Sequence, residues 1–273
     1  MPSRAARHPR FIAAAAAFAA AALCAVATAP PASAQSSVRY VALGDSYSSG
    51  LGAGSYTSSS GSCDRSTKAY SQLWANANDP ASYVSVACAG ATTGSVISTQ
   101  LSALSSTTTL ASITIGGNDV GFSSTMETCV LESTSSCVRA IDAGEAEVAN
   151  VLPGELNNML GDIASTAPNA RVVVLDYPEL YDLSRSSICI GLSTTDRTDL
   201  NQAADGLDSA IQAAAGRHGD TFVNVRPNFA GHEICDSSSW LHAVNILDIS
   251  ESYHPTAAGQ ADAYYPAFSG VVG

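Results

Sequence analysis

The chain has 273 residues, 46% of them hydrophobic, and carries 24 acidic against 12 basic residues, a formal net charge of −12. A surface this acidic repels nucleic acid and anionic membranes, so the composition excludes nucleic acid as a partner. The length suits one domain of ordinary size with a substantial core.

Residues 1–34 have the pattern of a secretory signal peptide. Three arginines form a basic start, an alanine-rich apolar stretch follows, and the small residues Ala-Ser-Ala at 32–34 resemble a cleavage site. The apolar stretch is long enough to be weighed as a membrane anchor, but its Ala-Pro-Pro-Ala-Ser-Ala ending favours cleavage and no second apolar stretch of spanning length follows, so we expect no stable membrane insertion. Residues 35–273 would then form one secreted, extracellular, monomeric domain with 9 basic and 24 acidic residues, a charge of −15.

Short apolar segments alternate with helical patterns along the mature chain. The predicted strands are Val38–Leu43, Tyr83–Cys88, Thr107–Ile115, Arg171–Asp176 and Phe222–Val225. The predicted helices are Tyr70–Ala77, Glu145–Ile163 with a break at Pro153, Asp196–Gly216, and Pro255–Phe268 directly after His254. This alternation predicts a three-layer α/β/α sandwich around a parallel five-stranded sheet.

Three of the predicted strands run into turns of the kind that carry functional groups in open parallel sheets. The first turn is Gly44-Asp45-Ser46, and the others follow residues 88 and 115. A serine between a strand and a helix can present its hydroxyl beside free backbone N–H groups, as an acyl-transfer nucleophile requires. The simpler interpretation is that Asp45 or Ser46 only caps the helix.

Four separate blocks of the chain resemble those of the SGNH, or GDSL-type, hydrolases. They are Gly44–Ser48, Gly90, Gly117–Asp119 and His254-Pro255, and they occur in the family's order across almost the whole mature chain. By overall layout the chain is most similar to small secreted actinobacterial lipases and phospholipases of that family. The resemblance implies a flavodoxin-like sheet and an ester-hydrolysing serine enzyme.

The same residues fit the roles that ester hydrolysis needs. Ser46 is the candidate nucleophile and His254 the candidate base. The candidate oxyanion donors are the backbone N–H groups of Ser46 and Gly90 and the side-chain amide of Asn118. The Gly-x-Ser-x-Gly elbow of α/β-hydrolases is not met, because Ser48 stands at its second glycine position.

The acceptor that orients His254 is open at this stage. Many family members have an aspartate three residues before the histidine, where this chain has Glu251. In the secreted lipases that it resembles, a main-chain carbonyl takes the role, and the matching group here is the carbonyl of Ser252. We expect the carbonyl rather than the carboxylate.

Six cysteines follow the leader, and an even number in an exported chain indicates disulfides. Sequence alone allows fifteen pairings. Because the cysteines fall in neighbouring loops, and because the resemblance supports the same scheme, we expect Cys63–Cys88, Cys129–Cys137 across a short Ser/Thr-rich loop, and Cys189–Cys235. No metal-ligand spacing is present, so we expect neither a metal nor another cofactor.

The sequence therefore predicts a secreted serine carboxyl-ester hydrolase of small-molecule or lipid esters, with lipase, esterase and phospholipase activity all open. Among enzymes, the alternative to a lipid-ester hydrolase is a carbohydrate acetylesterase. A non-catalytic binding protein on the same fold is the alternative outside them, but it has no need of the full set Ser46, Gly90, Asn118 and His254.

Overall fold

The computed structural model describes residues 1–3, 37–185, 189, 191–245 and 247–273. The chain divides into two units, residues 1–34 and residues 35–273. The predicted signal peptide coincides with the first unit and, after residue 3, lies outside the described residues. Every helix and strand that the structure describes belongs to the second unit, and none of these helices is both long and apolar enough to cross a membrane.

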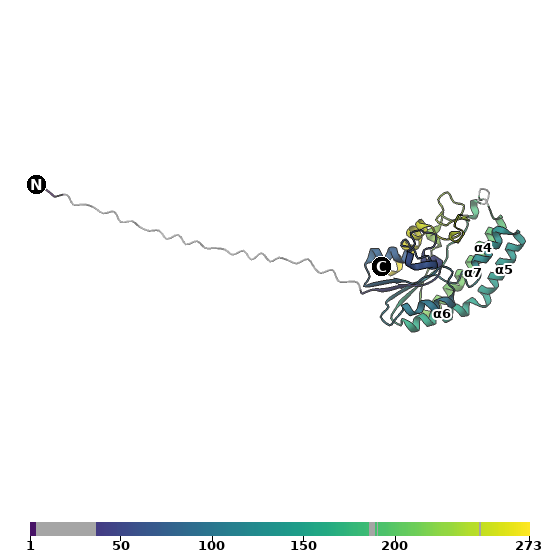
Figure 1. The fold of residues 1–273 in the computed structure, drawn as a ribbon, viewed down its shortest axis with the longest axis horizontal. Coiled ribbons are helices and arrows are strands. Elements are labelled where there is room, and N and C mark those ends of the chain that lie inside the picture. The colour runs from purple at the N-terminus through teal and green to yellow at the C-terminus, as the bar shows by residue number, and fades with distance from the viewer. Residues whose placement is uncertain (4–36, 186–188, 190, 246) are drawn as a thin grey trace. The chain divides into compact units, whose positions relative to one another are not determined.

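A parallel five-stranded sheet in the order β2-β1-β3-β4-β5 forms the centre of the fold, as predicted (Figure 1). The strands are β1 (Arg39–Ala42), β2 (Ser82–Ser85), β3 (Leu110–Ile113), β4 (Arg171–Leu175) and β5 (Thr221–Val223). This order is the flavodoxin-like one, in which the direction of winding reverses between β1 and β3 and leaves a crevice at the carboxyl ends of the strands. The turn after β1 leads into Ser46 at this edge of the sheet.

Helices cover the sheet in two groups, with the sheet between them (Figure 1). The longer helices are α2 (Tyr70–Asn78), α4 (Phe122–Leu131), α5 (Thr134–Asn150), α6 (Leu152–Thr166), α7 (Thr194–His218) and α9 (Tyr265–Val272). The short ones are α1 (Ser46–Ser49), α3 (Thr93–Ser95) and α8 (Arg226–Phe229), and a π-helical segment, Gly259–Tyr264, precedes α9. In one group α2 packs against α9, and in the other α7 packs on β4 and β5 with α5 and α6 beside it.

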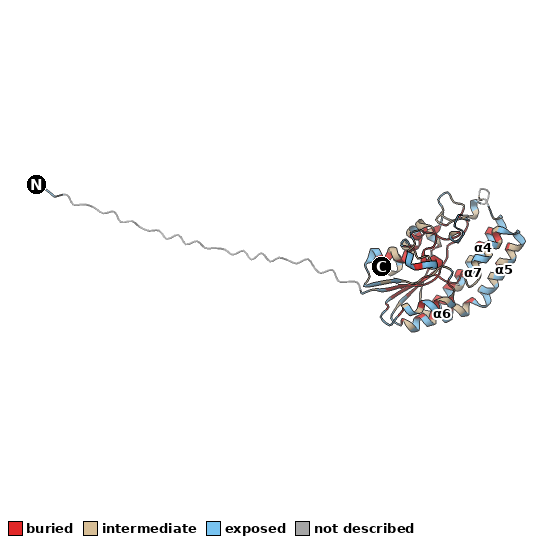
Figure 2. Cartoon of the chain, viewed as in Figure 1, coloured by how far each residue is buried: buried red, intermediate tan, exposed pale blue. Residues whose placement is uncertain are grey.

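Hydrophobic burial explains why these segments are strands and helices. All residues of β3 are buried, and β4 is buried apart from its first residue, so both strands are covered on both faces of the sheet (Figure 2). Helix α7 buries Leu200, Leu207 and Ile211 at helical spacing and begins with a capping box between Ser193 and Asp196. It runs two residues past the predicted end and stops at Gly219 instead of Gly216, with φ of 72° at that glycine.

The structure differs from the predicted elements at α4 with the start of α5 and at the last helical segment, and it confirms the predicted break at Pro153. Helix α4 was not predicted, and the segment from 129 to 137, predicted as a Ser/Thr-rich loop, is mostly the end of α4 and the start of α5. The break at Pro153 is a junction between α5 and α6, with the proline in the first turn of α6, where its missing N–H costs nothing. The helical run that leads through the π-helical segment into α9 begins at residue 257 rather than at Pro255, which instead forms a bridge to Leu241.

All three predicted disulfides are present: Cys63–Cys88, Cys129–Cys137 and Cys189–Cys235. The first ties the long loop after β1 to the segment after β2, and the second joins α4 to α5. Each closes a loop and so removes conformational freedom from the unfolded chain, a stabilisation of about 2–4 kcal/mol per bond.

Candidate active site

Ser46 is the first residue of α1, directly after the turn that leaves β1. The turn depends on Gly44, whose φ of 118° is closed to other residues and where a Cβ would lie 2.4 Å from the carbonyl oxygen of Thr114. Asp45 caps the helix, because its carboxylate accepts the N–H of Tyr47 at 2.9 Å. Asp45 therefore caps the helix, and Ser46, the next residue, also lines a cavity.

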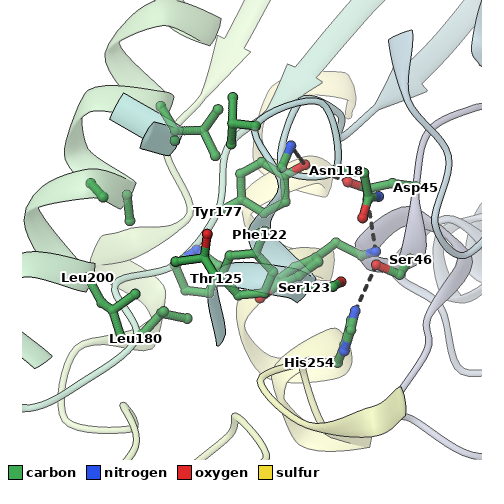
Figure 3. Close-up of a pocket in the computed structure, with 18 of the residues that line it drawn as sticks. Asp45, Ser46, Asn118, Phe122, Ser123, Thr125, Tyr177, Leu180, Leu200 and His254 are labelled. Atoms are coloured by element: carbon green, nitrogen blue, oxygen red, sulfur yellow. Dashed lines mark hydrogen bonds between the residues drawn. The ribbon is translucent and has the colours of Figure 1, made fainter. Parts of the chain in front are cut away.

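His254 contacts Ser46 although the two residues are 208 positions apart. Its Nε2 lies 2.7 Å from Ser46 Oγ (Figure 3). Its Nδ1 lies 2.9 Å from the carbonyl oxygen of Ser252. Burial lowers the pKa of His254 to about 4, with the Ser252 carbonyl opposing the shift. The imidazole is therefore neutral at neutral pH, with Nδ1–H donating to the carbonyl and Nε2 able to accept a proton from the serine.

The backbone between Ser252 and His254 is held in an uncommon conformation. Tyr253 has φ of 67°, in the left-handed region that a bulky residue seldom adopts. Its carbonyl accepts a 2.6 Å hydrogen bond from the hydroxyl of Tyr47, on the helix that carries the serine. This bond fixes the histidine segment to α1 and so fixes the distance between base and hydroxyl.

Glu251 is directed away from the histidine. Its Oε1 accepts a 2.5 Å hydrogen bond from the hydroxyl of Tyr56, and its Oε2 accepts one of 3.4 Å from the side-chain amide of Asn245. Tyr56 in turn accepts from the N–H of Gly52 at 2.9 Å, so the carboxylate links the loop after α1 to the loop before His254. The acceptor within reach of His254 Nδ1 is the Ser252 carbonyl.

The three expected oxyanion donors line one cavity together with His254. Among the described residues, the backbone N–H groups of Ser46 and Gly90 donate to no protein acceptor. A Cβ at Gly90 would meet nothing within 4 Å, so the space beside it is open. The amide of Asn118 donates one hydrogen to the carbonyl of Ala91 at 2.9 Å, which leaves the other for a ligand.

The loops that carry Gly90 and Asn118 are tied to each other. Besides the Asn118 bond, the Asp119 carboxylate accepts from the backbone N–H of Thr93 at 2.9 Å and from its hydroxyl at 2.7 Å. Burial raises the pKa of Asp119, and the bonds from Thr93 oppose that rise. The donors are thus fixed in place before a substrate arrives, as effective oxyanion stabilisation requires.

The cavity has a volume of about 260 Å³ and extends from Ser46 between α4, α5 and α7. Figure 3 shows Leu180 and Leu200 on the side of the cavity remote from Asn118 and Asp45. The apolar side chains that line it include Phe122, Ile141, Val148, Leu180, Leu200 and Leu207. Such a lining binds a hydrocarbon chain and offers few polar groups for a sugar.

No metal site is evident in residues 1–3, 37–185, 189, 191–245 and 247–273, where no three His, Cys, Asp or Glu residues form a group that could hold an ion.

The family model for GDSL-like lipases and acylhydrolases matches residues 42–261. The chain belongs to this family. It is 55% identical to Lipase 1 of Streptomyces coelicolor over 250 residues, which cover 92% of each chain. Phospholipase A1 from Streptomyces albidoflavus is 50% identical, with a TM-score of 0.83 over 85% of this chain and 98% of its own. The extracellular lipase from Streptomyces rimosus is 47% identical, with a TM-score of 0.83 over 86% of this chain and 100% of its own.

In this member of the GDSL family, the sequence reasoning missed Tyr177. Its hydroxyl donates to the Asp45 carboxylate and accepts the N–H of Gly117 at 3.0 Å, so it joins the serine turn to the Asn118 loop. Burial raises the pKa of Asp45 to about 7, and the Tyr177 bond opposes that rise. The position of Tyr177 in the sequence could have marked it as a site residue, because it lies just past the carboxyl end of β4, at the edge of the sheet where functional groups gather.

Proposed function

We propose that the protein is a secreted, monomeric carboxyl-ester hydrolase of lipid substrates that acts through an acyl-enzyme on Ser46. The observation that carries the proposal is the 2.7 Å contact between Ser46 Oγ and His254 Nε2 at the head of an apolar cavity. Family membership and the lipase and phospholipase A1 names of its relatives support lipids as the substrate class.

In the first half of the reaction, Ser46 Oγ attacks the ester carbonyl carbon and its proton passes to His254 Nε2. The Ser252 carbonyl stabilises the imidazolium through Nδ1–H, a dipole acting where many serine enzymes use a carboxylate. The negative charge on the substrate oxygen is stabilised by the N–H groups of Ser46 and Gly90 and by the Asn118 amide. The imidazolium then protonates the leaving alcohol.

In the second half, a water molecule attacks the acyl carbon while His254 accepts its proton; the bond between the acyl carbon and Ser46 Oγ then breaks, His254 returns the proton to Oγ, and the fatty acid leaves. The apolar cavity holds the acyl chain throughout. Because each buried methylene contributes about 0.8 kcal/mol, a chain that fills the cavity binds far better than an acetyl group. The cavity therefore favours lipid esters over acetylated carbohydrate.

The predicted leader, the three disulfides and the extracellular S. rimosus relative support secretion. N-terminal sequencing of the exported protein is expected to begin near residue 35. Size-exclusion chromatography is expected to give a monomer.

The test is a hydrolysis panel of p-nitrophenyl esters from acetate to palmitate, triglyceride, phosphatidylcholine and acetylated xylan. We expect kcat/KM to rise with acyl length and the xylan to be a poor substrate. In Ser46→Ala the loss should reach several orders of magnitude with unchanged thermal unfolding. Preference for acetylated xylan would establish the acetylesterase alternative, and no turnover of any ester would establish a binding protein.

A further inference from the structure

Among the described residues 244–245 and 247–249, shortly before His254, three large apolar side chains are exposed. The exposed fractions are 36% for Val244, 94% for Leu247 and 69% for Ile249. Single exposed apolar residues are common on soluble proteins, but several together mark a surface that binds something. We call Val244, Leu247 and Ile249 the apolar rim.

Hydrogen bonds hold the backbone that presents the apolar rim. The N–H of Asn245 donates to Ser252 Oγ at 2.9 Å. The side-chain oxygen of Asn245 accepts from the N–H groups of Leu247 at 3.1 Å and Asp248 at 3.3 Å, and its amide donates to Glu251. The polar groups are therefore engaged at the base of the loop while the apolar side chains point to solvent.

The apolar rim borders the active site. Ser250, the residue after Ile249, lines the cavity, and the carbonyl of Ser252 orients His254. A lipid ester that enters the cavity from an aggregate must leave that aggregate close to this loop. The position matches a surface that rests on the lipid while the substrate passes into the site.

The charge of the segment around the apolar rim indicates which kind of lipid surface it can bind. Within residues 242–254, the segment that carries the apolar rim, the charged side chains are the acids Asp248 and Glu251, and there is no lysine or arginine. Interfacial segments that bind anionic lipids carry basic residues for that purpose. An uncharged or zwitterionic lipid surface fits an apolar rim with acidic neighbours, whereas an anionic surface would be repelled.

We propose that the apolar rim inserts into the surface of uncharged or zwitterionic lipid aggregates and seats the active site on its substrate. The proposal rests on the proposed lipid hydrolysis and adds the surface that performs the docking. It separates two quantities, hydrolysis of dissolved esters, which needs only the active site, and hydrolysis at a lipid surface, which also needs the rim.

The test uses the mature protein with Leu247→Ser and Ile249→Ser combined. We expect hydrolysis of phosphatidylcholine vesicles to fall at least tenfold, while hydrolysis of dissolved p-nitrophenyl butyrate stays within twofold of wild type. The matched control combines Val84→Ser and Val151→Ser, which removes two apolar side chains exposed at 47% and 43% outside the rim and the cavity. The control is expected to match wild type on both substrates.

Binding is measured separately from turnover by vesicle flotation in the Ser46→Ala background. We expect Ser46→Ala to float with phosphatidylcholine vesicles, less with phosphatidylglycerol vesicles, and to lose flotation when the two rim substitutions are added. Flotation measures lipid binding and does not depend on hydrolysis. A failure of the docking surface can therefore be distinguished from a failure of the proposed function.

Three outcomes would overturn the proposal. Vesicle hydrolysis unchanged in the rim variant would remove the rim from docking. An equal fall on dissolved butyrate, with unchanged thermal unfolding, would mean that the loop shapes the active site instead. Stronger flotation with phosphatidylglycerol than with phosphatidylcholine would contradict the choice of lipid.

Discussion

Replacing Glu251 with glutamine tests how His254 is oriented. If the Ser252 carbonyl at 2.9 Å from Nδ1 is the acceptor, the substitution leaves that bond intact, because the carbonyl belongs to the main chain. We expect kcat/KM of Glu251→Gln to stay within about tenfold of wild type. If the carboxylate were the acceptor, its neutralisation should cost on the order of ten-thousandfold in kcat.

The structure also sets the size of the stability effect. A hydrogen bond to a charged group contributes roughly 1.5–3 kcal/mol and a neutral one about 0.5–1.5 kcal/mol. Glutamine keeps one acceptor for the hydroxyl of Tyr56 and loses the charge, so unfolding should become easier by about 1 kcal/mol. For a domain of this length that corresponds to a fall in Tm of roughly 2–4 °C.

The assay is hydrolysis of dissolved p-nitrophenyl butyrate, which avoids any contribution from lipid binding. Tyr56→Phe is the matched control, because it removes the same hydrogen bond from the other side. His254→Ala gives the level of an enzyme without its base. The reasoning is refuted if Glu251→Gln falls to the level of His254→Ala while its thermal unfolding and that of Tyr56→Phe remain close to wild type.

Four further outcomes are expected. Asn118→Ala should lower kcat about a hundredfold or more, as other single oxyanion donors do, and an unchanged rate would remove it from the site. Tyr177→Phe should lower kcat about tenfold with little change in KM, because it loosens the Asn118 loop, whereas a change in KM alone would point to substrate contact. Since burial holds the pKa of His254 near 4, kcat/KM should fall only as the pH drops through about 4, and a fall near pH 6.5 in folded protein would contradict this. Chelation with EDTA should leave activity unchanged, and restoration of lost activity by zinc or calcium would show a metal requirement.

Local patterns in the sequence determined most of the fold. Alternation of short apolar runs with helical stripes predicted the five strands and their parallel arrangement, because periodicity and Gly-rich ends report burial directly. It failed at α4 and at the start of α5, where Ser and Thr are abundant and the apolar stripe is weak. The Cys129–Cys137 disulfide joins these two helices, and α5 packs on α7, which lies about fifty residues further along the chain and is absent from any local pattern.

The sequence also determined which residue types could do acyl transfer, since Ser46, Gly90, Asn118 and His254 stand in blocks that resemble those of a known family. Only the tertiary structure decided how they meet. The contact between Ser46 and His254 spans 208 positions, and the direction of the Glu251 side chain depends on partners in distant loops. Side-chain direction follows from packing between segments that are far apart in the chain, and residue order by itself does not contain that information.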